Sequence, residues 1–260
     1  MELSHHRRGS GPPLVLVHGI GSRWQVWLPI LDRLAGRYDV IALDLPGFGA
    51  SASWPPGGTA PGSVPHLADL VTGFLDGLRV RSPAVAGSSL GGGVALELGR
   101  RGVARSVTAF APVGFYGPAG ARWCQAVVGA ARAGGTLLSP VLPPLMRTRA
   151  GRTALCGIFY ARPGRLDPSE CVADARSLVA APGFTKARRE LGSWRFDPGE
   201  PVGVPVTIAW GTRDLVLPCR QAARARRLLP QARHVRLEGC GHLPFGDDPA
   251  TCARLLIETG

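Results

Sequence analysis

Apolar runs of strand length alternate with segments of helical period along most of the chain. The apolar runs predict strands at residues 14–18, 40–43, 84–86, 106–111, 204–210 and 234–237. Apolar positions that recur every three or four residues predict helices at residues 27–37, 65–78, 90–100, 220–229 and from 249 onward. Residues 2–8 are a further candidate for a short edge strand. This alternation is typical of an α/β fold with a mostly parallel central sheet flanked by helices.

The alternation stops between residues 113 and 200. This stretch contains helical pieces that are broken by Pro-Gly and Pro-Pro pairs, and it has no clear strand. We therefore expect residues 1–112 and 201–260 to form an α/β core, and residues 113–200 to form a helical insertion on top of the sheet.

Composition and charge narrow the class of protein. The chain has 260 residues, a length that suits one large domain. Hydrophobic residues make up 45% and charged residues 18%, a composition that excludes a disordered chain. The net charge is +12, but the arginines are scattered and no nucleic-acid-binding motif is present, so we expect no nucleic-acid partner. The insertion carries twelve basic and six acidic residues, which leaves an anionic substrate or an acidic protein partner open.

The six cysteines form no CxxC pair and no Cys/His cluster with zinc spacing, so we predict no metal and no cofactor. No secretory signal and no 18-residue apolar stretch are found, so we expect a cytoplasmic protein without a membrane partner.

The first chemical motif is G-x-S-x-G at Gly87-Ser88-Ser89-Leu90-Gly91, which runs directly from a predicted strand into a predicted helix. This context is typical of a sharp turn that exposes one serine above the sheet, and its position makes Ser89 the candidate nucleophile. Glycine is needed on both sides because a Cβ atom there would contact the neighbouring strand and helix. Alone, the pentapeptide would equally suit an ordinary turn.

A second glycine-bearing loop, His18-Gly19-Ile20-Gly21, follows the strand at 14–18. Backbone N–H groups in such a loop can stabilise a developing oxyanion, and the candidates are those of Ile20 and Leu90. Leu90 also begins a helix, where the dipole favours negative charge. We interpret His18 as a structural residue that supports this loop.

Asp214 and His242 complete the constellation. Asp214 ends Trp210-Gly211-Thr212-Arg213-Asp214 after one predicted strand, and His242 ends Gly239-Cys240-Gly241-His242 after the next. By itself Asp214 would equally suit a helix cap. The order serine, acid, histidine along an α/β chain is that of α/β hydrolases.

With these motifs the chain resembles the α/β-hydrolase superfamily, specifically its cap-bearing serine hydrolases of the carboxylesterase-like branch. The resemblance is carried by HGIG at 18–21, DLPGFGAS at 44–51, GSSLGG at 87–92, WGTRD at 210–214 and GCGHLPFGDDP at 239–249. It implies that Ser89 attacks the substrate, that His242 acts as base and then acid, and that Asp214 orients His242. It also implies that residues 113–200 are a cap over the site. Few residues precede the HG motif, so we expect the family's usual first strand to be missing and the sheet to have roughly seven strands.

The resemblance implies a serine hydrolase that cleaves a carboxylic ester, thioester or lactone of a small to medium apolar substrate. We expect Trp24, Phe115 and Trp123 to line the substrate pocket. The positive cap would suit a substrate attached to an acidic acyl-carrier protein. Two alternatives remain open on the same fold. One is a tailoring enzyme that cleaves C–C bonds or cyclises a natural product, and the other is a receptor-like hydrolase with little turnover.

Overall fold

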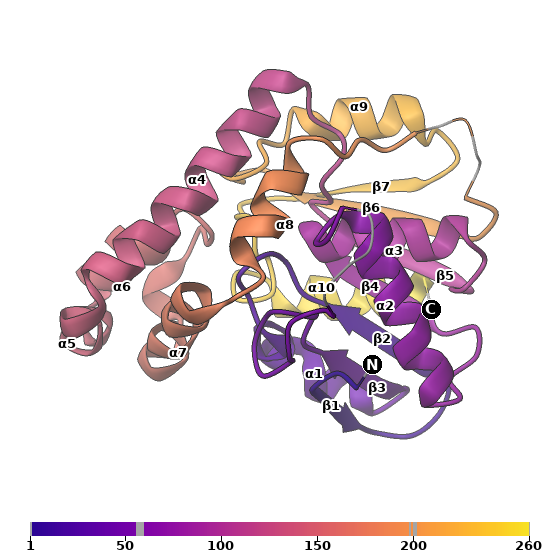
Figure 1. The fold of residues 1–260 in the computed structure, drawn as a ribbon, viewed down its shortest axis with the longest axis horizontal. Coiled ribbons are helices and arrows are strands. Elements are labelled where there is room, and N and C mark those ends of the chain that lie inside the picture. Colours follow the sequence, from indigo (N-terminus) through magenta and orange to yellow (C-terminus); the bar gives the residue numbers. More distant parts are fainter. Residues whose placement is uncertain (1, 56–59, 198, 200–201, 260) are drawn as a thin grey trace.

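One mostly parallel sheet organises the molecule (Figure 1). The computed structural model of the protein describes residues 2–55, 60–197, 199 and 202–259. In these residues seven strands lie in the order β1-β3-β2-β4-β5-β6-β7. They are β1 (His5–Arg8), β2 (Pro13–Val17), β3 (Asp39–Leu43), β4 (Ala84–Ser88), β5 (Ser106–Phe110), β6 (Val206–Gly211) and β7 (Arg233–Leu237). The predicted α/β fold with roughly seven strands is confirmed.

The edge strand β1 is the only antiparallel member among the described strands, and it pairs with β3 so that His5 lies opposite Leu43. All other pairs are parallel, and β4, β5 and β6 are buried along their whole length. This burial explains their mostly apolar sequences, since helices cover both faces of a parallel sheet.

The helices that flank the sheet bury two separate apolar clusters. They are α1 (Leu28–Ala35), α2 (Val64–Gly77), α3 (Leu90–Arg100), α9 (Gln221–Leu228) and α10 (Pro249–Thr259). Helices α2, α3 and α9 contribute to one cluster, and α1 and α10 to the other. The helix expected at 27–37 begins with a 3₁₀ turn at Trp24–Trp27 and becomes α-helical only at Leu28, because Pro29 fits only a first helical turn.

The chain between β5 and β6 builds a helical lobe, residues 118–191, which extends to one side of the sheet (Figure 1, left). Its helices are α4 (Pro118–Leu137), α5 (Leu142–Arg147), α6 (Arg149–Cys156), α7 (Pro168–Ala180) and α8 (Phe184–Leu191), with 3₁₀ turns at Ser139–Val141 and Pro163–Arg165. The described part of residues 113–200 contains no strand, as the sequence predicts. The expected boundary between residues 200 and 201 lies outside the described residues.

Backbone hydrogen bonds tie the helical lobe to the core: Gly183 N donates to Gly47 O (2.9 Å), and Leu243 N donates to Phe159 O (2.9 Å). Beside the lobe, Phe196 N donates to Gly114 O (3.2 Å), which joins the two segments through which the chain leaves and re-enters the core. Within the described part of the chain, no helix is both long enough and apolar enough to cross a membrane.

Candidate active site

Ser89 sits at a sharp turn between β4 and α3, in a backbone conformation that side chains rarely adopt. Its φ is 56° and its ψ is −115°. The turn is held by Ser89 N, which donates to Phe110 O (2.9 Å), and by Ser89 O, which accepts from Gly93 N and Val113 N (both 3.1 Å). Such strain persists only where the surrounding structure fixes it, and it is common at functional sites.

The two glycines of the motif allow this turn to pack closely. A Cβ atom on Gly87 would lie 2.0 Å from Gly91 O, and one on Gly91 would lie 2.2 Å from Val17 O. No side chain fits at these distances, so α3 can approach β2 and β4 only with glycine at both positions. The structure therefore agrees with the steric reason inferred from the sequence.

Asp214 and His242 meet at the ends of β6 and β7. Asp214 Oδ2 lies 2.8 Å from His242 Nδ1, and both side chains are buried. Asp214 Oδ1 accepts from Val216 N (2.9 Å) and Leu217 N (2.8 Å), which fixes the carboxylate. A proton on Nδ1 would complete this bond and leave Nε2 free as a proton acceptor.

Ser89 and the glycine-bearing loop lie together. A Cβ atom on Gly19 would lie 3.7 Å from Ser89 Oγ. The amides of Ile20 and Leu90 have no hydrogen-bond partner within the described part of the chain, so both are available to an oxyanion. The described residues also provide no hydrogen bond between Ser89 and His242. Catalytic hydrogen bonds are often long before substrate binds.

His18 is a structural residue of this loop. Its Nδ1 lies 2.7 Å from Gly19 O, and its Nε2 accepts from Leu45 N (2.9 Å). Complete burial lowers the pKa of His18, although the nearby Asp44 carboxylate opposes this effect. Asp44 in turn accepts from Trp24 N (2.6 Å) and Ala50 N (2.9 Å), and thus joins two loops at the edge of the sheet.

Asp247 is a buried acid that the sequence did not single out. Its Oδ2 accepts from Gly241 N (2.8 Å) and Ala161 N (2.9 Å), and its Oδ1 accepts from Arg162 N (2.8 Å). One carboxylate therefore joins the loop that carries His242 to the helical lobe. The motif GHLPFGDDP contains Asp247, but nothing in the sequence indicates that residues 161–162 approach it.

An apolar cavity of about 410 Å³ lies between the core loops and the helical lobe. On the core side it is lined by Ile20, Gly21 and Leu243, which adjoin the glycine-bearing loop and His242. On the lobe side it is lined mainly by apolar side chains of α4, α6 and α7 and by Phe159. We call it the inner cavity.

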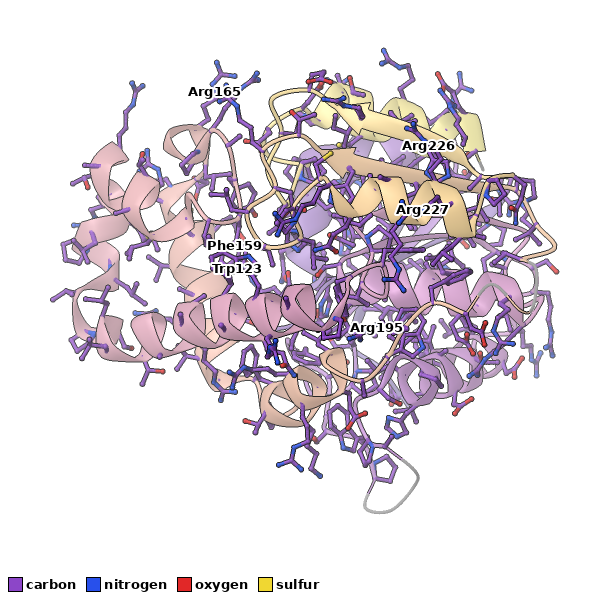
Figure 2. The ribbon with its side chains drawn as sticks, turned by 90° about the horizontal axis from the view of Figure 1, so that it is seen from above. Trp123, Phe159, Arg165, Arg195, Arg226 and Arg227 are labelled. Atoms are coloured by element: carbon purple, nitrogen blue, oxygen red, sulfur yellow. The ribbon has the colours of Figure 1, made fainter. Side chains whose placement is uncertain are left out.

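None of the three side chains expected to line a substrate pocket lies along the inner cavity. Phe115 is fully buried and stacks on Phe196, with ring centroids 5.3 Å apart. Trp123 lies on α4 (Figure 2) and is 50% exposed; its Nε1 donates to Leu215 O. Trp24 stacks on His6 and lines a different groove. Apolar character alone therefore did not indicate which side chains line the inner cavity.

The basic side chains are spread over the molecule. Figure 2 shows Arg165 on the helical lobe and Arg226 and Arg227 on α9. Across the described residues, no group of three or more His, Cys, Asp or Glu is placed to hold a metal ion. All six cysteines are free thiols.

The fold and the motifs at its strand ends define a hydrolase of the α/β class. The family model described as "Alpha/beta hydrolase family" matches residues 14–255, and the chain belongs to this family. An uncharacterized protein of Mycobacterium tuberculosis (strain ATCC 25618 / H37Rv) is 31% identical, over 93% of this chain and 73% of that protein.

Two further relatives carry names that describe an activity. A pimeloyl-[acyl-carrier protein] methyl ester esterase of Aeromonas hydrophila is 44% identical over 38% of this chain and 36% of its own length. The structure of a thermophilic esterase from Thermogutta terrifontis matches 98% of this chain and 92% of that chain, with a TM-score of 0.73 and 22% identity. At 22% identity, the similarity to the Thermogutta terrifontis esterase shows the fold alone.

Proposed function

We propose that the protein is a serine hydrolase that cleaves a carboxylic ester, thioester or lactone of a small to medium apolar substrate. The observation that carries this proposal is the buried Asp214–His242 hydrogen bond at the same sheet edge as the strained Ser89 turn. A binding protein has no need of an oriented histidine together with a serine held at a positive φ.

The reaction begins when Ser89 Oγ attacks the carbonyl carbon and its proton passes to His242 Nε2. Asp214 stabilises the imidazolium, and the amides of Ile20 and Leu90 bind the oxyanion. The intermediate collapses to an acyl-enzyme as His242 protonates the departing alcohol or thiol. Water then attacks with His242 as base, and the acid is released as Ser89 recovers its proton.

The helical lobe acts in this proposal as a cap, and the inner cavity beneath it accepts the apolar acyl group. The cavity volume of about 410 Å³ supports an acyl chain of small to medium size. The partial match to a pimeloyl-[acyl-carrier protein] methyl ester esterase supports ester chemistry, and makes an acyl-carrier protein a candidate partner.

The decisive experiment is intact-mass spectrometry after incubation with a fluorophosphonate probe. We expect one adduct on the wild-type protein and none on Ser89→Ala. Turnover of a p-nitrophenyl ester should fall by roughly 10³-fold or more in that variant. Ser88→Ala is the matched control and should retain the adduct. A folded wild-type protein without any adduct would contradict the proposal and favour a tailoring or receptor-like role.

A further inference from the structure

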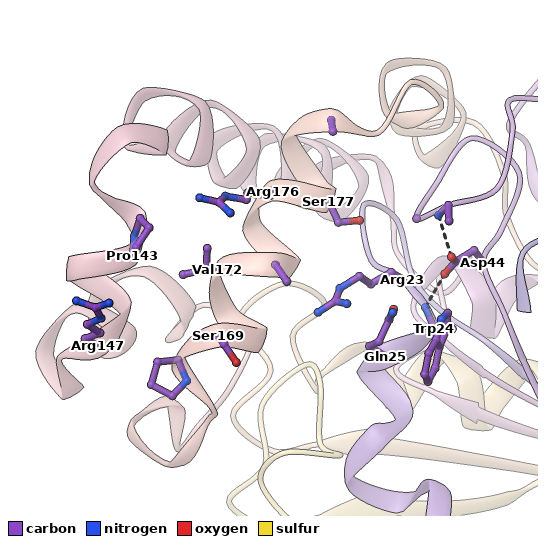
Figure 3. Close-up of a pocket in the computed structure, with 15 residues that line it drawn as sticks. Arg23, Trp24, Gln25, Asp44, Pro143, Arg147, Ser169, Val172, Arg176 and Ser177 are labelled. Atoms are coloured by element: carbon purple, nitrogen blue, oxygen red, sulfur yellow. Dashed lines mark hydrogen bonds between the residues drawn. The ribbon is translucent and has the colours of Figure 1, made fainter. Parts of the chain in front are cut away.

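A second cavity lies on the other side of α7 from the inner cavity. This outer groove, of about 800 Å³, is bounded by α5, by α7 and by the core loops that carry Trp24 and Asp44 (Figure 3). Successive side chains of α7 divide between the two cavities: Ala173 and Ser177 line the outer groove, whereas Asp174 and Leu178 line the inner one. Helix α7 is therefore a partition with a separate cavity on each side.

The lobe end of the outer groove carries uncompensated positive charge. Figure 3 shows Arg147 and Arg176 on the same side of α7, with Pro143 and Val172 beside them. In the residues that the structure describes, neither guanidinium has a hydrogen-bond or ion-pair partner. The sequence explains part of this excess, because no Asp or Glu occurs between residues 97 and 167.

The other charged groups that line the groove are already paired. Arg23 forms ion pairs with Glu170 and with Asp174, the latter at 2.8 Å. The Asp44 carboxylate accepts backbone N–H groups of Trp24 and Ala50. An incoming anion would therefore meet Arg147 and Arg176 as the free cations of this groove, as far as the structure describes it.

Two polar atoms of groove residues are also unsatisfied. Ser177 Oγ and Gln25 Oε1 are buried and have no hydrogen-bond partner in the described part of the protein. Buried polar atoms are almost always paired, so such atoms often mark a place that a ligand or an ordered water completes.

We propose that the outer groove binds an aliphatic oxyanion, that is, an alkyl chain ending in a carboxylate or a phosphate. The chain would lie along the apolar strip of Pro143 and Val172, and the oxyanion would accept from Arg147 and Arg176. The ligand needs both an alkyl chain and an anionic end, because the side chains of Pro143 and Val172 are apolar and the unpaired groups of Arg147 and Arg176 are cationic. This inference does not rest on the proposed hydrolase activity, since binding is measured without turnover.

The test is calorimetric titration of the full-length protein with decanoate, decyl phosphate and decanol. The double variant Arg147→Gln/Arg176→Gln removes both free cations. Arg149→Gln/Arg165→Gln is the matched control, because it removes two exposed arginines of the same lobe that do not line the groove. We expect both anions to bind more tightly than decanol. We also expect the double variant to raise their Kd by about tenfold at low salt, and the control to leave it unchanged.

Binding of only one of the two anions would support the proposal and show whether the groove takes a carboxylate or a phosphate. Equal binding of decanol and decanoate would overturn it, since the chain would then occupy the apolar inner cavity. Anion binding that is unchanged in the double variant, or absent from the wild-type protein, would overturn it too. A thermal melt of each variant confirms that the compared proteins are folded.

Discussion

Asp247 offers the sharpest test of how the His242 loop is held. Replacing it with alanine removes the acceptor of three backbone N–H groups, those of Gly241, Ala161 and Arg162. A buried donor left without a partner costs about 1–3 kcal/mol. The Gly241 bond is buried and the other two are partly buried. Losing the acceptor should therefore cost about 2 kcal/mol at Gly241 N and about 1 kcal/mol at each of the other two N–H groups. The expected loss is about 4 kcal/mol, or a fall in Tm of about 10 °C for a chain of this size.

The measurement is thermal unfolding followed by circular dichroism, together with kcat on a p-nitrophenyl ester. Because Gly241 precedes His242, a loosened loop should lower kcat in the Asp247→Asn variant, which keeps one acceptor oxygen and loses less stability. Asp32→Ala is the control, since Asp32 is an exposed acid paired only with Arg8 in the described structure, and it should change stability by less than about 0.5 kcal/mol. An Asp247→Ala protein that melts within about 2 °C of the wild type would refute this reasoning.

Three further predictions concern packing, pH and the size of the inner cavity. Gly91→Ala should destabilise the fold by several kcal/mol or prevent folding, because its Cβ would lie 2.2 Å from a backbone oxygen. The control Gly73→Ala should stabilise the fold slightly, since a Cβ there would meet nothing within 4 Å. Urea unfolding measures both effects. Burial lowers the pKa of His18 below its ordinary 6.5, so the unfolded chain binds an extra proton below that pH. The free energy of unfolding should therefore decrease as pH falls below 6.5, by up to about 1.4 kcal/mol per pH unit, and a His18→Gln protein with the same slope would contradict this. Ala175→Leu should raise KM for long acyl esters more than for acetate esters by narrowing the inner cavity, whereas Ala173→Leu, on the other side of α7, should not.

The fold was predictable because its signals are local. The buried strands β4, β5 and β6 are mostly apolar runs, and helix α3 begins directly after Ser89. The candidate triad could also be predicted, since each of its members lies in the loop that follows a strand, and parallel strands end at a common edge. The hydrogen bond between Asp214 and His242 agrees with that prediction, while the catalytic roles stay a proposal.

The lining of the cavities could not be predicted, because it depends on how the helical lobe rests on the core. Phe115 and Trp123 have equally apolar side chains, but one is buried against Phe196 and the other is half exposed on α4. The bonds of Asp247 likewise join residues more than 80 positions apart. No periodicity or short motif encodes such a contact.

The backbone of Ser89 has a consequence for how this chain can evolve. A non-glycine residue at a φ of 56° and a ψ of −115° costs of order 1–3 kcal/mol relative to a relaxed conformation. Glycine would relieve that strain, so Ser89→Gly would favour the folded state while deleting the hydroxyl. Selection for stability alone would thus drive the position away from serine. If Ser89 has the proposed catalytic role, this position is one where function opposes thermostability at a single residue.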